Sequence, residues 1–98
     1  MAQQQGFRPQ YRMQRRGQVE LLYGKSRSSI YADIADGVWP PSVRLGANCV
    51  AWLEHETQAV LAARVAGKQD QEVRELVKEL VAARALPGLT ASEGGGES

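Results

Sequence analysis

Glycine and proline interrupt this 98-residue chain at several points, and these interruptions limit the length of every element that it can form. Proline removes a backbone donor and glycine readily takes the left-handed conformation that ends a helix, so neither residue suits a helix interior. The interruptions lie at Gly24, Gly37, Pro40-Pro41, Gly67 and Pro87-Gly88. The chain is therefore expected to form one small domain of short elements.

Two short helices are predicted before the paired prolines, over Gln18–Tyr23 and Arg27–Asp36. Ile30 and Ile34 stand one turn apart in the second segment and give it an apolar face. Ser26, directly before that segment, is a favourable N-cap. Only three residues join the two helices, which is the spacing of a helix-turn-helix.

Two β-prone segments follow, Ser42–Leu45 and Cys49–Trp52, and the residues between them, Gly46-Ala47-Asn48, have the chemistry of a hairpin turn. A third helix is then predicted over Leu53–Ala66, with Gly67 as its stop. The predicted inner side of this helix consists of Leu53, Thr57, Val60, Leu61 and Val65.

The last predicted helix covers residues 70–86, with Asp70 as its N-cap. Apolar residues recur along it at helical spacing and form a broad stripe: Val73, Leu76, Val77, Leu80 and Val81. Such a stripe either folds back on its own domain or pairs with the same helix of a second copy. The second alternative is favoured because a small domain gains from added burial, and it predicts a homodimer on an inverted-repeat DNA site.

The net charge of the chain is +1, but the charges are unevenly distributed. Residues 1–46 hold seven basic and three acidic side chains, whereas residues 47–98 hold five basic and eight acidic ones. The basic half suits a polyanion, and the acidic half is expected to face away from it. The polar ends, residues 1–10 and 87–98, are predicted to be a flexible arm and a disordered tail around a domain over residues 11–67.

A helix-turn-helix followed by a hairpin predicts a winged helix-turn-helix fold, mainly α with a small β-hairpin and a C-terminal helix. In this architecture the second helix enters the DNA major groove, about 12 Å wide, and the hairpin reaches the neighbouring backbone or minor groove. Small polar and basic residues at the start of that helix suit phosphate and base-edge contacts. The predicted DNA-binding residues are Arg15, Arg16, Lys25, Ser26, Arg27, Ser28, Ser29, Tyr31, Arg44 and Asn48.

Two sequence blocks at their mutual spacing carry a family resemblance. They are Ser26-Arg27-Ser28-Ser29-Ile30-Tyr31, and Pro40-Pro41-Ser42-Val43-Arg44-Leu45-Gly46 followed by Val50-Ala51-Trp52. With these blocks, residues 10–67 resemble the AlpA family of prophage regulators. The resemblance implies a MerR-like winged-helix fold and a transcriptional regulator that binds DNA on a mobile element. The family is also similar to the small excisionases that bend DNA for recombination.

The chain departs from the family pattern at three places. Lys25 stands where the family usually has an apolar residue, so either the turn packs differently or Lys25 makes an extra phosphate contact. The hairpin tip, Gly46-Ala47-Asn48-Cys49, lacks the usual arginine, which leaves Arg44 and Asn48 as its candidate contacts. The helix over residues 70–86 lies beyond the usual family domain.

Several conspicuous side chains are predicted to be structural. Trp39, Trp52 and Cys49 are expected to be buried, and His55, between two glutamates, is expected on the solvated surface. One histidine and one cysteine cannot build a four-ligand zinc site. The sequence contains no nucleophile–base pair, phosphate loop or dinucleotide fingerprint, so no enzyme, cofactor or small-molecule substrate is predicted. No segment suits a membrane span or a secretory signal, and a cytoplasmic protein is expected.

The leading hypothesis is a sequence-specific transcriptional regulator of a prophage or other mobile element that binds double-stranded DNA. An excisionase-like factor that bends DNA uses the same residues and stays open as an alternative. A protein-interaction adaptor with a degenerate helix-turn-helix is the alternative of another class. Its support in the sequence is the altered hairpin tip.

Overall fold

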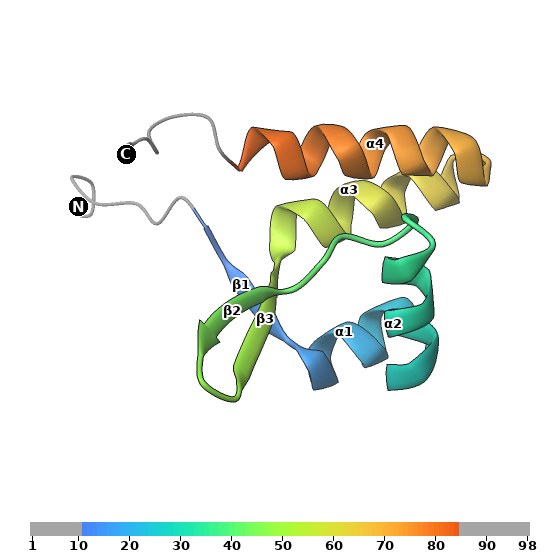
Figure 1. The fold of residues 1–98 in the computed structure, drawn as a ribbon. Coiled ribbons are helices and arrows are strands. Elements are labelled where there is room, and N and C mark those ends of the chain that lie inside the picture. Colours follow the sequence, from blue (N-terminus) through green and yellow to red (C-terminus); the bar gives the residue numbers. More distant parts are fainter. Residues whose placement is uncertain (1–10, 85–98) are drawn as a thin grey trace, which may run out of the picture.

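The computed structural model describes residues 11–84 of the chain (Figure 1). Its elements are, in order, β1 (Met13–Arg15), α1 (Arg16–Tyr23), α2 (Arg27–Ala35), β2 (Val43–Gly46), β3 (Cys49–Leu53), α3 (Glu54–Val65) and α4 (Asp70–Ala83). Two helices followed by a hairpin confirm the predicted fold class, a mainly α winged helix-turn-helix. The predicted arm over residues 1–10, the predicted tail over residues 87–98 and the predicted helix end at Leu86 lie outside the described residues.

Local contacts fix both helices of the helix-turn-helix. The Gln18 side chain accepts a hydrogen bond from the backbone N–H of Arg15 at 2.9 Å, and α1 accordingly begins earlier than predicted. Gly24, with φ at 73°, ends α1 in the left-handed conformation. Ser26 caps α2 as predicted, because its Oγ accepts a hydrogen bond from the backbone N–H of Ser29 at 3.3 Å.

The sheet has three antiparallel strands in the order β1-β3-β2, one strand more than the predicted hairpin. Strand β1 has only three residues, too few for a periodic pattern, and it forms by pairing along the edge of β3. In the hairpin, Gly46 lies opposite Cys49, so the turn consists of Ala47 and Asn48. The register shifts at Leu45, which forms a bulge next to the turn.

The core is centred on two tryptophans. Trp39 and Trp52 are fully buried, as predicted, and the indole N–H of Trp52 donates to the Pro40 carbonyl at 2.9 Å. Tyr23 stacks on Trp39 with ring centroids 3.9 Å apart. Cys49 is only partly buried, contrary to prediction, because β3 begins beside the exposed turn. The other buried members of this cluster are Val19, Ile30, Val38, Val60, Val73 and Val77.

The predicted inner side of α3 is buried or partly buried at Thr57, Val60 and Leu61. Leu53 is buried as well, but as the last residue of β3. Val65 is 89 % exposed, so its prediction as an inner residue is wrong. It lies in the last turn of α3, where the chain leaves the core toward α4.

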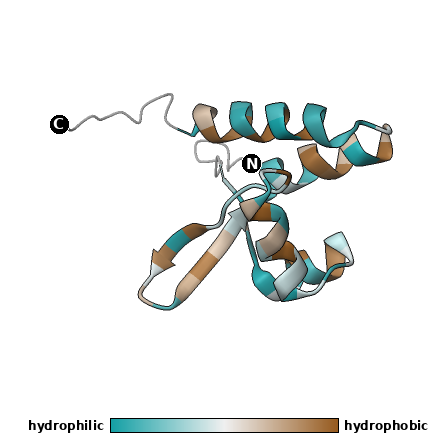
Figure 2. Ribbon diagram, turned by 45° about the vertical axis from the view of Figure 1, so that its right-hand side comes forward, coloured by the Kyte–Doolittle hydropathy of each residue, from teal (hydrophilic) through white to brown (hydrophobic). Residues whose placement is uncertain are grey.

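Helix α4 packs on α3 and on the core of its own chain. Val73 is fully buried and Val77 is 6 % exposed, while Leu76, Leu80 and Val81 are partly buried against the same core. The apolar stripe thus covers its own domain, which is the alternative that the sequence left open. Figure 2 shows that the outer side of α4 is mostly hydrophilic. Pairing of two copies through the stripe stays a prediction, and it requires α4 to leave its domain.

The start of α4 differs from the prediction by one residue. Gln69, not Asp70, is the N-cap, and its backbone N–H donates to Oε1 of Glu72 at 3.0 Å. Asp70 is the first helical residue, and its carboxylate lies 2.9 Å from the guanidinium of Arg64. A carboxylate in the first turn is favourable because it faces the positive end of the helix dipole.

Candidate nucleic-acid interface

The start of α2 presents a polar and basic surface. Ser26, Arg27, Ser28 and Ser29 are all exposed there. The Ser26 and Ser29 hydroxyl oxygens lie 3.2 Å apart in a hydrogen bond, in addition to the capping bond, so these two side chains are fixed relative to one another. The first backbone N–H groups of a helix point outward and favour an anion such as a phosphate.

Within residues 11–84, three arginines have no carboxylate oxygen within 4.0 Å: Arg15, Arg27 and Arg44. The other lysines and arginines of this part each have one: Arg12, Arg16, Lys25, Arg64, Lys68, Arg74, Lys78 and Arg84. An arginine without an acidic neighbour is available for a phosphate or a base edge. All three arginines belong to the set predicted to bind DNA.

The sheet register divides these three arginines between two faces. Arg44 lies opposite Val50, which packs against the core, whereas Arg15 lies opposite Ala51. Adjacent residues of a strand point to opposite faces, so Arg44 shares the sheet face that carries α2, and Arg15 lies on the other face. Arg27 and Arg44 therefore belong to one side of the molecule, and Arg15 flanks it. The hairpin turn and α1 lie at the end of the molecule opposite α4, whereas the C-terminal end of α2 approaches α4 (Figure 1).

The β2–β3 hairpin forms the wing. Nε of Arg44 donates to the Gly46 carbonyl at 3.2 Å, which holds the guanidinium along the strand near the turn. Asn48 is exposed in the turn itself, and Leu45 in the bulge is 50 % exposed. Arg44 and Asn48, the two side chains that were predicted as wing contacts, are therefore both exposed.

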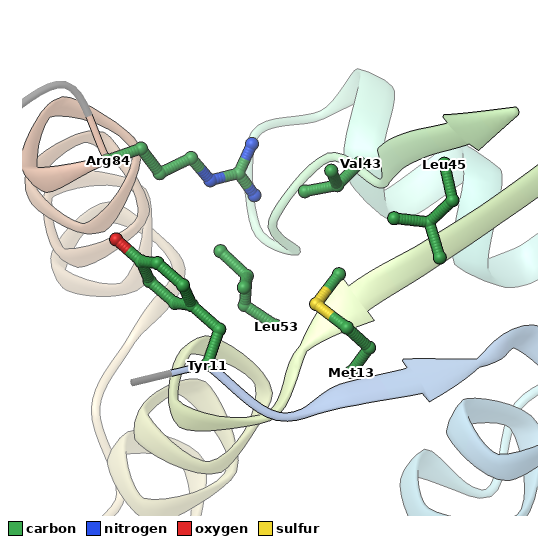
Figure 3. Close-up of a pocket in the computed structure, with 6 residues that line it drawn as sticks. All are labelled: Tyr11, Met13, Val43, Leu45, Leu53 and Arg84. Atoms are coloured by element: carbon green, nitrogen blue, oxygen red, sulfur yellow. The ribbon is translucent and has the colours of Figure 1, made fainter. Parts of the chain in front are cut away.

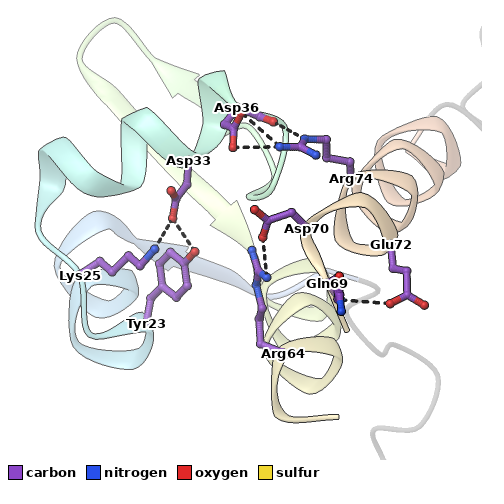
Figure 4. Close-up of polar contacts among 9 residues, drawn as sticks. All are labelled: Tyr23, Lys25, Asp33, Asp36, Arg64, Gln69, Asp70, Glu72 and Arg74. Atoms are coloured by element: carbon purple, nitrogen blue, oxygen red, sulfur yellow. Dashed lines mark hydrogen bonds and ion pairs between the residues drawn. The ribbon is translucent and has the colours of Figure 1, made fainter. Parts of the chain in front are cut away.

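Lys25 is engaged within the chain. Its ammonium lies 2.7 Å from Oδ2 of Asp33 and 4.8 Å from the centroid of the Tyr23 ring (Figure 4). The Tyr23 hydroxyl donates to the same carboxylate oxygen at 2.6 Å. Lys25 is thus paired within its own chain while 42 % of its side chain stays exposed, and its contact with a phosphate stays a prediction. Sequence analysis did not identify Tyr23 or Asp33, because a contact between α1 and α2 leaves no local motif.

The protonation of this cluster follows from its contacts. Burial raises the pKa of Asp33, whereas the hydrogen bonds from Lys25 and Tyr23 lower it. The lowering by the hydrogen bonds exceeds the rise from burial, so the pKa of Asp33 lies below its ordinary value of 3.8. Burial, and then the hydrogen bond to Asp33, raise the pKa of Tyr23. The hydrogen bond to Asp33 also raises the pKa of Lys25. At neutral pH the cluster therefore consists of a carboxylate, an ammonium and a neutral phenol.

Asp33→Asn is expected to lower the melting temperature at neutral pH and to have a smaller effect in acid. A carboxylate whose pKa is lowered on folding stabilises the fold while it is ionised, and this contribution disappears as the pH falls below 3.8 through the folded pKa. Thermal melts of both proteins at about pH 7 and about pH 2 measure the difference. Glu75→Gln, in an exposed pair on α4, is the control, with little effect at either pH. A pH-independent difference for Asp33→Asn would contradict the prediction.

The remaining predicted contacts are less available to a ligand. The Arg16 guanidinium lies 3.5 Å from the Glu20 carboxylate. Tyr31 is 38 % exposed, and its ring centroid lies 6.2 Å from that of Trp52, so part of the ring covers the core. Both residues stay predictions as DNA contacts.

A buried ion pair, which sequence analysis missed, joins the start of α3 to the end of α4. Glu56, expected on a polar face, is fully buried, and Arg84 donates to both of its carboxylate oxygens. Arg84 also donates to the Pro41 carbonyl at 2.8 Å. Partners so far apart in sequence produce no periodic pattern, so no signal in the chain indicated them. His55, the neighbour of Glu56, is exposed as predicted.

An apolar groove of about 360 Å³ lies beside this pair, on the outer face of the sheet (Figure 3). It is lined by Tyr11, Met13, Val43, Leu45, Leu53 and Arg84. Between residues 11 and 84, no cluster of three or more histidine, cysteine, aspartate or glutamate side chains is arranged to hold a metal ion. The described residues that line the groove include no histidine, cysteine, aspartate or glutamate. In the same range, no helix has the length and apolar character that a membrane crossing requires.

The fold and the basic surface beside the wing define a winged helix-turn-helix protein. The chain belongs to the AlpA family of prophage regulators, since residues 12–65 match the family described as "Prophage CP4-57 regulatory protein (AlpA)". The family predicted from the sequence is confirmed. Helix α4 lies outside the matched residues.

The chain is also similar to a protein of Enterobacteria phage P4 that is described as "Uncharacterized protein ORF88". The two are 47 % identical over 60 residues, which cover 61 % of this chain and 68 % of the phage protein. No solved structure matches the chain.

Proposed function

We propose that the chain is a sequence-specific regulator that binds double-stranded DNA of a prophage or other mobile element. The observation that carries the proposal is the pairing of two surfaces on one side of the molecule. The start of α2 presents Arg27 among exposed serines, and the wing presents Arg44, and neither arginine has a carboxylate within 4.0 Å among the described residues. Family membership supports the regulatory role.

In this proposal, the start of α2 enters the major groove. Arg27 takes the O6/N7 edge of a guanine, which is the commonest specific contact of an arginine with DNA. Ser26 and the first backbone N–H groups of α2 hold a phosphate. Arg44 and Asn48 contact the backbone on one flank, and Arg15 contacts it on the other. The proposal includes no catalytic step and no cofactor, and it places the protein in the cytoplasm with the DNA.

A salt titration against two duplexes tests the proposal. One duplex is selected by the full chain from a random pool, and the other is a scrambled sequence of the same composition. Binding to phosphates releases counterions, so each contact contributes about −0.9 to the slope of log K against log salt concentration. The chain is expected to show a steep slope and a clear preference for the selected duplex. Binding that is absent or independent of salt would overturn the DNA proposal and favour the adaptor.

Three variants assign the contacts. Arg27→Ala is expected to weaken binding to the selected duplex by about 1–3 kcal/mol, with less effect on the scrambled one, since it removes a base contact. Arg44→Ala is expected to weaken both duplexes alike and to reduce the salt slope by about 1. Lys78 lies on α4 and is 76 % exposed, so Lys78→Ala is the control. It should change neither the affinity for the two duplexes nor the salt slope. Equal weakening of both duplexes by Arg27→Ala would place Arg27 on a phosphate instead.

The same selected duplex separates the related alternatives. An excisionase-like factor bends its site, which fluorescence energy transfer between the ends of the duplex would detect. A homodimer would select an inverted repeat with its two halves about one helical turn apart, whereas a monomer would select a single half-site. Because Val73 and Val77 lie in the core, a dimer formed through them needs exchange of α4 between copies.

A further inference from the structure

Helix α4 contacts both ends of the link between α2 and β2, residues 36–42. Near its start, Arg74 donates from Nε to the Asp36 carbonyl at 3.0 Å and from Nη2 to Oδ2 of Asp36 at 3.2 Å (Figure 4). At its end, Arg84 donates from Nη2 to the Pro41 carbonyl at 2.8 Å. The segment that connects the recognition helix to the wing is therefore held at two points by one helix.

The first of these contacts fixes the C-terminal end of α2. Asp36 is the C-cap of α2, so the Arg74 guanidinium lies at the negative end of the helix dipole and satisfies a carbonyl that has no partner within the helix. The next residue, Gly37, has a left-handed φ of 83°, and the aliphatic part of the Arg74 side chain lies beside it at ordinary van der Waals distance. The contact therefore restrains both the position and the direction of the end of α2.

Helix α4 is itself firmly anchored. Val73 and Val77 lie in the core, on the same side of the helix, and Arg84 is paired with the fully buried Glu56. Because α4 is fixed near its start and at its end, it can in turn fix the position of the link over residues 36–42. The position of the link therefore depends on α4 and not only on α2 and β2.

A small rotation at the held end produces a large displacement at the DNA end of α2. With about 1.5 Å of rise per residue, the first turn lies roughly 12 Å from the C-cap, and a tilt of about 10° moves it by about 2 Å. Base-edge hydrogen bonds fail over such a distance because donor and acceptor must lie within about 3.2 Å. Long flexible side chains on phosphates tolerate the same shift, so specificity is more sensitive than overall affinity.

We propose that α4 is a brace that sets the recognition helix relative to the wing, and that Arg74 is a positioning residue for DNA specificity. The specificity part rests on the proposed function, whereas the mechanical part rests on the contacts alone. The brace lies outside residues 12–65, which match the family.

The first test compares Arg74→Ala with Arg64→Ala on the selected and scrambled duplexes. Arg64 forms an exposed ion pair with Asp70 at 2.9 Å between α3 and α4, and it does not touch the link, so it is a matched control (Figure 4). Arg74→Ala is expected to reduce the preference for the selected duplex by about three- to tenfold with an unchanged salt slope. Arg64→Ala should retain the preference, and Arg74→Lys, which keeps a cation beside Asp36, should recover part of it.

The second test needs no DNA. Spin labels are placed at Ser28→Cys in α2 and Ala47→Cys in the wing turn, with Cys49→Ser to remove the natural cysteine. Electron–electron distance measurements are expected to give a broader or shifted distribution in Arg74→Ala than in the otherwise unchanged chain, and no change in Arg64→Ala.

The outcomes separate the two proposals. Coincident distance distributions for Arg74→Ala and its parent would overturn the brace, whatever the chain does with DNA. A changed distribution with an unchanged preference for the selected duplex would overturn the specificity role of Arg74. Failure of the unmodified chain to prefer any duplex would overturn the proposed function, and the distance measurement would still decide whether α4 is a brace.

Discussion

Glu56→Ala is expected to lower the free energy of unfolding by about 3 kcal/mol, because it leaves a gap in the interior and leaves the guanidinium of Arg84, which is only 24 % exposed, without its partner. Glu56 is fully buried and accepts two hydrogen bonds from Arg84. The loss is large compared with the stability of a small domain, roughly 5–15 kcal/mol. Urea denaturation of both proteins, followed by circular dichroism, measures the difference.

Glu54→Ala is the matched control for this prediction. Glu54 lies two residues earlier in α3, and its pair with Arg12 is long, at 3.9 Å, and exposed. Removing an exposed pair of this kind costs about 0–1 kcal/mol. A double variant, Glu56→Leu with Arg84→Met, should be less destabilised than Glu56→Ala since it leaves no unpaired charge. Similar losses for Glu54→Ala and Glu56→Ala would contradict the structural role of the buried pair.

A chain that ends at Gly67 is expected to lose cooperative folding altogether. Removal of α4 takes Val73 and Val77 out of the core and leaves Glu56 unpaired. A domain this small has little stability in reserve, so the loss of one side of its core should abolish the sigmoidal thermal transition. Circular dichroism melts and light scattering on the shortened chain measure folding and mass together.

A chain that ends at Arg84 is the control, because it keeps every described element, and it should melt cooperatively. A shortened chain that stays folded as a monomer, while the full chain is a dimer in solution, would show that α4 joins two copies instead of completing one domain.

The parts of the fold that the sequence predicted are those that depend on neighbouring residues. Ser26 caps the helix that follows it, Gly24 ends the helix before it, and the turn at Ala47 and Asn48 joins the strands on either side. Each of these features is set by residues within a few positions of one another, so a single sequence contains the necessary information.

The parts that could not be predicted depend on contacts between distant segments. Strand β1 exists because β3 has an edge to pair with, and Glu56 is buried because Arg84 reaches it from another helix. Lys25 illustrates the same limit at the candidate site. Its charge suggested a phosphate contact, and nothing in the sequence indicated that Asp33 of α2 also pairs with it. The three arginines without carboxylate neighbours could be separated from the rest of the predicted set only once the packing was known.

The two ends of the described chain lie on the same side of the molecule. Tyr11 and Arg84 line a single groove on the outer face of the sheet, away from the face that carries α2 (Figure 3). A fluorophore or affinity handle attached at Tyr11 or Arg84 should therefore leave the recognition helix unobstructed. The same proximity makes residues 11–84 suitable for circular permutation, in which a short linker joins Arg84 to Tyr11 and new ends open elsewhere.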